Sequence, residues 1–337
     1  MRLSLKNLSE QVIVITGASS GIGLVTARLA ARRGARLVLV SRSDEVLRRL
    51  AAELTGQGAE VAYVAADVGD EGQVREVARV AIERFGGFDT WVNNAGVSIF
   101  GRYEDVPMAD QYKLFQTNFW GVVNGSLIAA EHLKQRGGAI INLGSELSDV
   151  AIPLQGMYSA SKHAVKGFTD SLRIELEHAR TPIAVTLIKP ASMDTLFIDH
   201  ARNYMNVEPK LAQPVYAPEL AAEAILYAAQ HPRRDIFVGG AARLTSVSAR
   251  VAPRSTDWVM RALGFRSQRT DQPAGDRNDI LESPGATLRE RSGRQHVFER
   301  SLMTSAELHP KSVIAIGLAA LALFALWRMG RPPGARA

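Results

Sequence analysis

Tyr158 and Lys162 stand four residues apart in the chain. If the segment is helical, the two side chains lie on the same face, with Cβ atoms roughly 5–6 Å apart. A free tyrosine has a pKa of about 10, and a neighbouring ammonium group is expected to lower the pKa of the Tyr158 phenol. The pair could then exchange a proton with a substrate hydroxyl or carbonyl near neutral pH, while Ser145 holds the substrate oxygen. Alone, this spacing is also common on solvated helix faces.

A glycine-rich segment at residues 16–23 follows an apolar run at residues 12–15 and precedes a helical pattern at residues 24–33. The β-branched run predicts a buried strand. Strand, glycine-rich turn and helix in this order are typical of a dinucleotide-binding unit, in which the backbone and the helix start receive a phosphate. The alternative is a glycine-rich loop without a ligand.

Ser41 and Arg42 follow a second predicted strand at residues 36–40. NAD-selective sites usually have an acidic residue here that binds the ribose 2′-hydroxyl, and this chain has none. The Arg42 guanidinium instead suits a 2′-phosphate, so the sequence predicts NADP(H) in preference to NAD(H). Alternatively, Arg42 is only the solvated start of the helix predicted at residues 44–54.

Strands and helices alternate through the rest of the first 240 residues. Further strands are predicted at residues 60–65, 89–92, 139–143, 183–188 and 235–238, and helices at residues 70–85, 108–135, 157–178 and 218–230. This alternation predicts an α/β fold, a doubly wound parallel sheet with helices on both faces. The residues that could perform chemistry all follow the carboxyl ends of strands, where ligands bind in such sheets.

These motifs together resemble the short-chain dehydrogenase/reductase family in its single-domain, Rossmann-type form. The resemblance covers about residues 9–240 and rests on Thr16-Gly17-x-x-x-Gly21-Ile22-Gly23, Asn93-Asn94-Ala95-Gly96, Asn118, Ser145 and Tyr158-x-x-x-Lys162. It implies hydride transfer between C4 of a nicotinamide and a carbonyl or alcohol carbon. It also implies a homodimer or homotetramer formed through the helices near residues 108–135 and 157–178.

The resemblance assigns roles to individual residues. Tyr158 would be the general acid/base, Lys162 would lower its pKa and bind the nicotinamide ribose, and Ser145 would orient the substrate oxygen. Asn118 would hold a water molecule that links Lys162 to solvent. The expected cofactor contacts are Gly17, Ser19, Ser20, Gly21, Ile22, Gly23, Ser41, Arg42, Asp67, Val68, Asn94, Ala95, Gly96, Tyr158, Lys162, Pro190 and Thr195. No metal site is expected. Many family members have Pro-Gly after the sixth strand, where this chain has Pro190-Ala191.

Substrate identity in this family comes from the segment after the sixth strand, here about residues 191–216. Its apolar side chains favour a hydrophobic alcohol or ketone, or else they only pack the loop onto the domain. They are Met193, Leu196, Phe197, Ile198, Tyr204 and Met205. His200 could face the pocket, although a single histidine is more often structural.

The charge of +6 is unevenly distributed. Residues 241–337 contain 15 Lys and Arg against 8 Asp and Glu, a net charge of +7, which leaves −1 for residues 1–240. A nucleic-acid partner is therefore not expected, whereas a basic tail suits an anionic membrane surface. There are no cysteines, which excludes disulfides and thiolate nucleophiles and fits a reducing compartment. Residues 1–10 lack the apolar core of a secretory signal, so we expect a cytoplasmic catalytic domain.

Three segments follow the predicted catalytic domain. Residues 241–267 are basic and amphipathic, and would either lie on a membrane or cap the substrate pocket. Residues 268–310 are predicted to be a flexible linker. Residues 311–330 contain an uncharged run, residues 313–327, that would extend ~22 Å as a helix and ~27 Å if Arg328 snorkels. They are a candidate membrane anchor, with a short helix packed on the domain as the alternative.

Two functions fit these observations. The first is an active NADP(H)-dependent oxidoreductase. The second is a membrane-associated scaffold that binds the cofactor without catalysis. The presence of Asn118, Ser145, Tyr158 and Lys162 together favours the enzyme.

Overall fold

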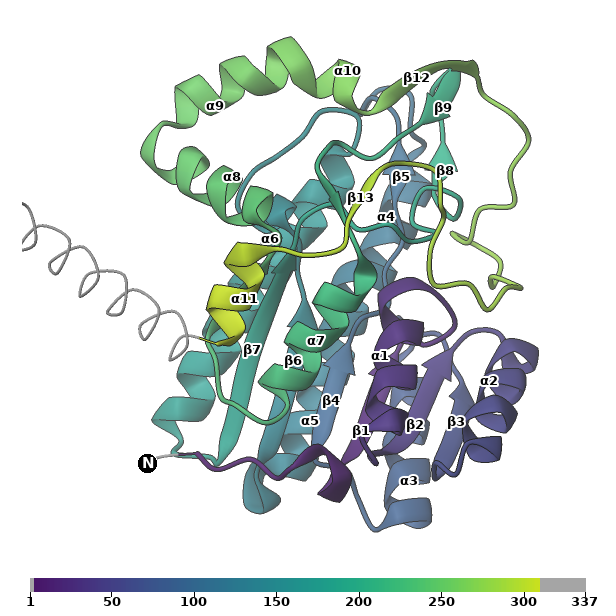
Figure 1. The fold of residues 1–337 in the computed structure, drawn as a ribbon, viewed down its shortest axis with the longest axis vertical. Coiled ribbons are helices and arrows are strands. Elements are labelled where there is room, and N and C mark those ends of the chain that lie inside the picture. Colours follow the sequence, from purple (N-terminus) through teal and green to yellow (C-terminus); the bar gives the residue numbers. More distant parts are fainter. Residues whose placement is uncertain (1–2, 310–337) are drawn as a thin grey trace, which may run out of the picture.

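The structure is a computed structural model that describes residues 3–309 of the chain. Its centre is a seven-stranded parallel sheet with the order β11-β7-β6-β4-β1-β2-β3 (Figure 1). The strand order reverses between β1 and β4, which confirms the predicted doubly wound α/β fold. The strands are β1 (Val12–Thr16), β2 (Arg36–Ser41), β3 (Val61–Ala65), β4 (Thr90–Asn93), β6 (Gly138–Leu143), β7 (Ile183–Pro190) and β11 (Asp235–Val238).

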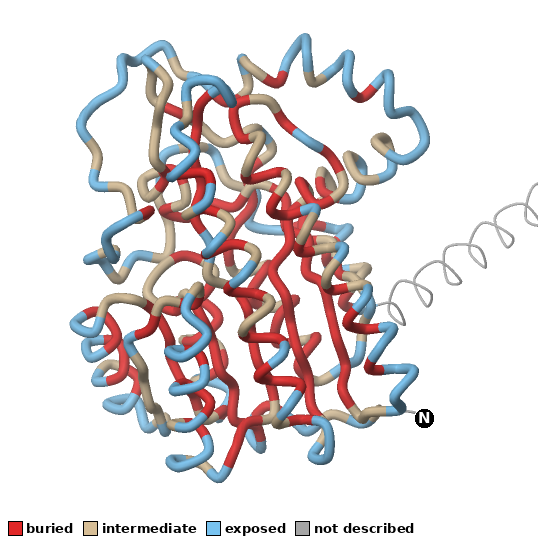
Figure 2. Tube along the Cα trace, turned by 180° about the vertical axis from the view of Figure 1, so that it is seen from behind, coloured by how far each residue is buried: buried red, intermediate tan, exposed pale blue. Residues whose placement is uncertain are grey.

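Alternate side chains of each central strand pack against helices on opposite faces of the sheet. In β1, Ile13 and Ile15 join the apolar cluster of α1 (Gly21–Arg32), α2 (Asp44–Gly56) and α7 (Pro218–Ala228). Val12 and Val14 join the cluster of α3 (Glu71–Phe85), α5 (Gly121–Arg136) and α6 (Gly156–His178). Figure 2 shows the central strands as buried chain. Each such side chain contributes about 1.5–3 kcal/mol when it is fully buried, so the sheet is a rigid support for the loops at its edge.

The long helix predicted at residues 108–135 is interrupted. It consists of α4 (Met108–Phe115), a π-helical turn (Gln116–Trp120) and α5. The turn contains the fully buried Asn118, which bonds both backbone groups of Val97. A single π-helical turn inside an α-helix is common at functional sites, and here it turns an amide side chain inward.

An arm of helices follows the last strand of the sheet. It comprises α8 (Gly240–Val251), α9 (Pro253–Val259), a π-helical turn (Met260–Gly264) and α10 (Phe265–Ser267), and it projects at the top of Figure 1. Most of the arm is exposed. In α8, one residue is buried, Ala242. The basic extension predicted at residues 241–267 is therefore helical.

After the arm, the chain returns to the domain and pairs with the predicted substrate segment, residues 191–216. Strand β12 (Arg269–Pro273) pairs with β9 (Val207–Pro209), and β13 (Val297–Phe298) pairs with β10 (Val215–Tyr216). Strand β5 (Ile99–Phe100) pairs with β8 (Arg202–Asn203), and α11 (Leu302–Leu308) packs beside α7 and β11. Short 3-10 turns occur at Leu8–Glu10 and Glu146–Ser148.

The prediction of a flexible linker at residues 268–310 is wrong for the described part of that range. Leu281 is fully buried, and charged residues of this segment form ion pairs with the domain. Asp279 pairs with Arg202 at 2.9 Å, and Glu290 pairs with Arg28 at 2.9 Å. Composition suggested a solvated segment because it does not reveal partners that lie some 80 to 260 residues away.

Within residues 3–309, no helix has the length and apolar character needed to cross a membrane. The candidate anchor at residues 311–330 lies outside the described residues.

Candidate active site

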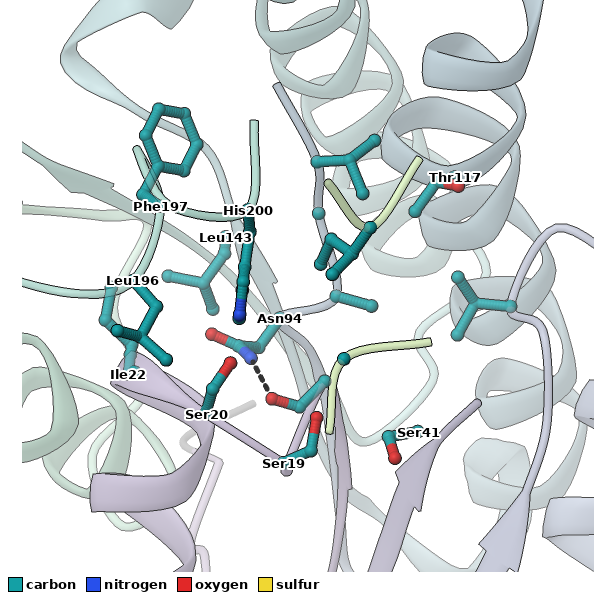
Figure 3. A pocket seen from close by; sticks show the side chains of 18 of the residues that line it. Ser19, Ser20, Ile22, Ser41, Asn94, Thr117, Leu143, Leu196, Phe197 and His200 are labelled. Carbon is teal, nitrogen blue, oxygen red and sulfur yellow. Dashed lines mark hydrogen bonds between the residues drawn. The ribbon is translucent and has the colours of Figure 1, made fainter. Parts of the chain in front are cut away.

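A cleft opens at the carboxyl ends of β1, β2, β4 and β6, beside the point where the strand order reverses (Figure 3). Ligands of doubly wound sheets bind at this position. The structure brings together all the residues predicted to contact the cofactor except Gly23. Those lining the cleft are Gly17, Ser19, Ser20, Gly21, Ile22, Ser41, Arg42, Asp67, Val68, Asn94, Ala95, Gly96, Tyr158, Lys162, Pro190 and Thr195.

Gly17 and Gly23 are needed for close packing of the glycine-rich turn. Gly17 has φ +67°, and a Cβ atom there would lie 2.8 Å from the Ala95 Cα atom. A Cβ atom on Gly23 would lie 2.1 Å from the Gly17 carbonyl oxygen, so Gly23 seats α1 against the turn and does not line the cleft. The resulting bare backbone at the start of α1 fits the pyrophosphate of a dinucleotide.

Hydrogen bonds join the ends of β1 and β4 below the cleft. The Asn94 amide nitrogen Nδ2 donates to the carbonyl oxygens of Thr16 (2.9 Å) and Gly17 (3.2 Å). The Thr16 hydroxyl accepts from the backbone N–H groups of Asn94 (3.0 Å) and Ala95 (3.1 Å). Two neighbouring strands are therefore fixed to one another at the floor of the site.

A second network supports the predicted catalytic residues. Asn118 Nδ2 donates to the Val97 carbonyl (2.9 Å) and to the Ser161 hydroxyl (3.2 Å), and Ser161 donates to the Tyr158 carbonyl (2.7 Å). Lys162 Nζ donates to the Leu143 carbonyl oxygen at 2.8 Å. The π-helical turn, the end of β6 and the start of α6 are thereby connected around Tyr158.

Tyr158 and Lys162 are both buried on the same face of α6. Burial raises the pKa of the Tyr158 phenol well above its usual value, a hydrogen bond with Ser145 opposes that rise, and the charge of Glu146 adds to it. Burial also lowers the pKa of Lys162 to about 8. The expected lowering of the Tyr158 pKa by Lys162 is thus reversed, because removal of both groups from water has the larger effect.

An apolar cavity adjoins the cleft and shares Tyr158 with it. Ser145 lines this second cavity, as do Met193 and Phe197 from the predicted substrate segment. The remaining apolar wall comes from Ile22, Leu147, Ile152, Pro190, Ala191, Leu211 and Ala212.

Other residues of the predicted substrate segment lie elsewhere. Leu196 and His200 line the cofactor cleft, where the His200 ring points inward (Figure 3). Ile198 packs in a small cluster with Phe100, and Tyr204 donates its hydroxyl hydrogen to Asp110. Met205 packs against the same small cluster.

Five polar residues of the apolar cavity were not predicted from the sequence, namely Glu146, Gln155, Ser192, Lys210 and Gln268. Glu146 lies beside Ser145, and burial raises the pKa of its carboxyl to about 7. Gln268 is 1% exposed, and its amide nitrogen donates to the carbonyls of Pro153 and Gly264. Its Oε1 atom is a buried acceptor that has no partner within residues 3–309. Gln268 immediately follows the amphipathic extension at residues 241–267. The alternative in which this extension caps the substrate pocket was therefore the feature of the sequence that could have indicated Gln268.

Further cleft residues that the sequence analysis did not predict come from residues 268–310, the segment predicted to be a flexible linker. Ile280, Pro284 and Gly285 line the cofactor cleft. Arg42, the predicted 2′-phosphate ligand, donates to backbone carbonyls of this segment, including Leu281 (3.2 Å). The adjacent Ile280 and Leu281 are an apolar pair in an otherwise polar stretch. This pair was the local feature of the sequence that indicated a segment packed on the domain.

Comparisons with known proteins agree with this geometry. The family model described as short chain dehydrogenase matches residues 11–205. The uncharacterized oxidoreductase YxnA of Bacillus subtilis (strain 168) is 43% identical over 328 residues, which cover 95% of this chain and 92% of that protein. The 11-beta-hydroxysteroid dehydrogenase A of Sesamum indicum is 31% identical over 273 residues, with 78% of each chain covered.

Solved structures show the same relationship. An alcohol dehydrogenase from the archaeon Thermococcus sibiricus, complexed with 5-hydroxy-NADP, is 31% identical and has a TM-score of 0.59. The match covers 67% of this chain and 95% of that chain. A short-chain type dehydrogenase/reductase from Mycobacterium marinum is 27% identical with a TM-score of 0.62, over 70% and 96% of the two chains.

Proposed function

Because this chain belongs to the short-chain dehydrogenase/reductase family and is an oxidoreductase, we propose that it transfers a hydride between NADP(H) and the carbonyl or alcohol group of a hydrophobic substrate. One observation carries the proposal. Tyr158 lines both the cleft that fits a dinucleotide and the adjoining apolar cavity. A substrate oxygen beside its phenol would therefore lie between the two spaces, with Ser145 in the same cavity.

The chain's own residues perform the proton transfer in this proposal. The bound nicotinamide supplies or accepts the hydride. Tyr158 donates its phenolic proton to the carbonyl oxygen during reduction, and takes a proton from the alcohol during oxidation. Ser145 donates a hydrogen bond that orients the same oxygen. Lys162, charged below about pH 8, favours the phenolate that remains after proton transfer. Asn118 fixes the backbone beside them and orders the water through which the proton is replaced.

The preference for NADP(H) is supported by two observations. Arg42 follows β2 at the edge of the cleft, and the neighbouring positions Ser41 and Ser43 are not acidic. The relative from Thermococcus sibiricus has an NADP derivative bound. A guanidinium forms strong charge-assisted bonds with a phosphate, whereas a ribose hydroxyl gains less from it.

A hydrophobic substrate is supported by the lining of the cavity. Most of its wall is apolar, and the buried Gln268 Oε1 atom, which has no partner in the part of the chain that the structure describes, suits one hydroxyl or amide hydrogen of the substrate. The plant relatives named as 11-beta-hydroxysteroid dehydrogenases fit the same class of substrate. We therefore place the substrate among hydrophobic ketones and alcohols with at least one further hydrogen-bond donor.

Association with other molecules is proposed from exposed apolar side chains. On α4 to α6, Tyr112, Leu127 and Ile174 are more than half exposed, which supports a homodimer or homotetramer through these helices. On the arm, Leu244 and Trp258 are 72% and 62% exposed among arginines, which supports contact with an anionic membrane surface. The base of the arm, at Gly264, packs against Pro153 near the substrate cavity.

The test is oxidation of NADPH by the full chain with a panel of hydrophobic ketones and aldehydes, together with the reverse reaction on the matching alcohols. Tyr158→Phe is expected to lower kcat by about 10²–10⁴-fold while NADPH still binds, because the ring remains and the proton is lost. Tyr112→Phe, on the exposed surface of α4, is the matched control. NADPH binding without turnover of any substrate in either direction would instead favour a catalytically idle scaffold.

A further inference from the structure

Residues 279–293, which we name the strap, cross the mouth of the cofactor cleft. The segment belongs to the yellow-green chain between β12 and β13 in Figure 1. Ile280, Pro284 and Gly285 of the strap form part of the cleft wall. The cleft is therefore built mainly from residues between Gly17 and His200, and is closed by residues 280–285 from much later in the chain.

The strap accepts hydrogen bonds from Arg42, the side chain that we assign to binding of the 2′-phosphate. Arg42 Nη1 donates to the carbonyls of Leu281 (3.2 Å) and Glu282 (3.4 Å). Arg42 Nη2 donates to the carbonyls of Ser283 (3.3 Å) and Ile280. Both terminal nitrogens of the guanidinium are thus directed at the strap backbone. A phosphate could reach them only in exchange for these carbonyl oxygens.

The strap also occupies a backbone donor of the pyrophosphate site. The N–H group of Gly21, at the start of α1, donates to the Arg289 carbonyl at 3.0 Å. Free N–H groups in the first turn of a helix are the usual donors to a phosphate. Two separate groups that we assign to phosphate binding, the Arg42 guanidinium and the Gly21 N–H, therefore bond to the same segment.

Both ends of the strap are anchored by buried or ionic contacts, and its middle is held by hydrogen bonds and an ion pair with the domain. At one end Leu281 is buried in the apolar cluster that contains Tyr158 and Val97, and Asp279 pairs with Arg202. At the other end the Asp194 carboxylate accepts from Ser292 Oγ (2.5 Å) and from the N–H groups of Ser292 (3.2 Å) and Gly293 (3.1 Å).

Between these anchors, most residues are exposed. The exposed positions are Glu282, Ser283, Pro284, Ala286, Thr287 and Arg289. The middle is largely exposed to solvent, but it is bonded through Ala286 to Arg49 (2.9 Å) and through Glu290 to Arg28 (2.9 Å), so these contacts must break when it leaves the cleft.

We propose that the strap is an intramolecular competitor for the phosphate donors of the cofactor site, and that NADP(H) binds by displacing residues 280–289 of the strap. This inference rests on the proposed function. The strap carbonyls are neutral, whereas a phosphate brings an opposite charge to the Arg42 guanidinium and can accept two parallel bonds from it, so the exchange at Arg42 favours the cofactor. The 2′-phosphate is needed at Arg42, so NADPH should displace the strap more completely than NADH. Only molecules with an open strap bind the cofactor. The apparent dissociation constant is therefore the intrinsic one divided by the fraction of molecules that are open.

Hydrogen exchange of the unmodified full chain tests the direction of the movement. The amides of Ile280 and Leu281 donate to the His200 carbonyl (3.0 Å) and to Asp279 (2.9 Å), so their exchange reports on the strap. We expect NADPH to slow exchange in residues 16–23 and 93–97, and to accelerate it several-fold in residues 280–289. NADH should have a smaller effect on residues 280–289. Slower exchange in both regions would show a strap that closes over the cofactor, and would overturn the proposal.

Two strap variants and one control test the competition by equilibrium titration with NADPH. Leu281→Ala removes the buried anchor, and Ser292→Ala removes a bond to Asp194 at the other end. Both are expected to bind NADPH more tightly, by about tenfold for Leu281→Ala, because a loosened strap is open more often. Leu302→Ala deletes the same side chain at a position that is 92% exposed, and should leave the dissociation constant unchanged.

The possible outcomes separate this inference from the proposed function. Equal or weaker affinity in both folded strap variants, with folding checked by thermal unfolding, would refute competition even if the enzyme is active. Failure of NADPH to bind to the unmodified chain and to either variant would overturn the cofactor assignment, and the strap proposal with it. Tight binding without turnover would contradict the proposed reaction while the strap proposal stands.

Discussion

The Lys162 ammonium nitrogen lies 5.6 Å from the centre of the Tyr158 ring and donates a 2.8 Å hydrogen bond to the Leu143 carbonyl at the end of β6. The two side chains thus share a face of α6, while a strand end fixes the position of the charge. In the proposed reaction this charge has to be present when the tyrosine gives up its proton.

The first prediction concerns the alkaline limb of the pH profile. Lys162 has a pKa of about 8, so its ammonium form, which favours the phenolate, is lost as the pH rises above that value. We expect kcat/KM for carbonyl reduction to fall by up to about tenfold per pH unit above about pH 8. Lys162→Met should have lower activity and should lack this limb. Lys134→Met, on the exposed side of α5, should keep it, and a limb that persists in Lys162→Met would assign the titration to another group.

Arg42→Ala should change the ratio of cofactor affinities. Loss of a charge-assisted bond to the 2′-phosphate is expected to weaken NADPH binding by about 1–3 kcal/mol. Binding of NADH should be unchanged or tighter, because the variant also frees the strap from one of its partners. Titration of both cofactors, with the exposed Arg48→Ala on α2 as control, measures this ratio. An equal loss for the two cofactors would show that Arg42 does not recognise the 2′-phosphate.

Glu146→Gln is expected to stabilise the protein at alkaline pH. Burial raises the pKa of Glu146 from 4.5 to about 7, so the folded state binds more protons than the unfolded state between these values. The stability contributed by the protonated carboxyl is present below about pH 4.5 and is lost as the pH rises through 7. The variant should therefore gain up to about 3 kcal/mol at pH 8, since each unit of pKa difference corresponds to about 1.4 kcal/mol, and almost nothing near pH 4.5. Urea unfolding at the two pH values provides the measurement, with the exposed Glu104→Gln as control.

The arm is expected to bind anionic lipid surfaces. Arg250, Arg254 and Arg261 are exposed on α8, α9 and the π-helical turn, and each basic residue near such a surface contributes about 1 kcal/mol. Replacing all three with Glu should reduce binding of the full chain to phosphatidylserine vesicles by at least about 100-fold at low salt. Replacement of Arg48, Arg84 and Lys134 with Glu is the control of equal charge. Binding that resists both salt and the arm substitutions would exclude the arm as the contact.

The sequence was sufficient to predict the sheet and the floor of the site. The position of Tyr158 relative to Lys162 depends on helical spacing, and the glycine-rich turn lies directly between β1 and α1. Such relationships involve neighbours in the chain, so they follow from local geometry. The π-helical interruption between α4 and α5 at Asn118 cannot be predicted from local geometry, because it depends on two hydrogen bonds with the Val97 backbone, 21 residues away.

Burial and distant partners explain the predictions that differ from the structure. Spacing placed Lys162 next to Tyr158, but it did not show that both would be removed from water, which reverses the direction of the Tyr158 pKa. The polar composition of the strap predicts a linker. Its bonds to Arg42 join residues about 240 positions apart, which no local pattern can indicate.

The pairing of β12 with β9 and of β13 with β10 has a consequence for the order in which the protein is made. Domains fold from the amino terminus during synthesis, so the sheet and the glycine-rich turn can form while the carboxyl-terminal residues are still inside the ribosome. The substrate segment receives its partner strands only when residues 269–298 have emerged. We therefore expect nascent chains stalled before residue 269 to show a protease-resistant sheet and a protease-sensitive segment at residues 191–216. Resistance of that segment in such chains would show that it folds without its partners.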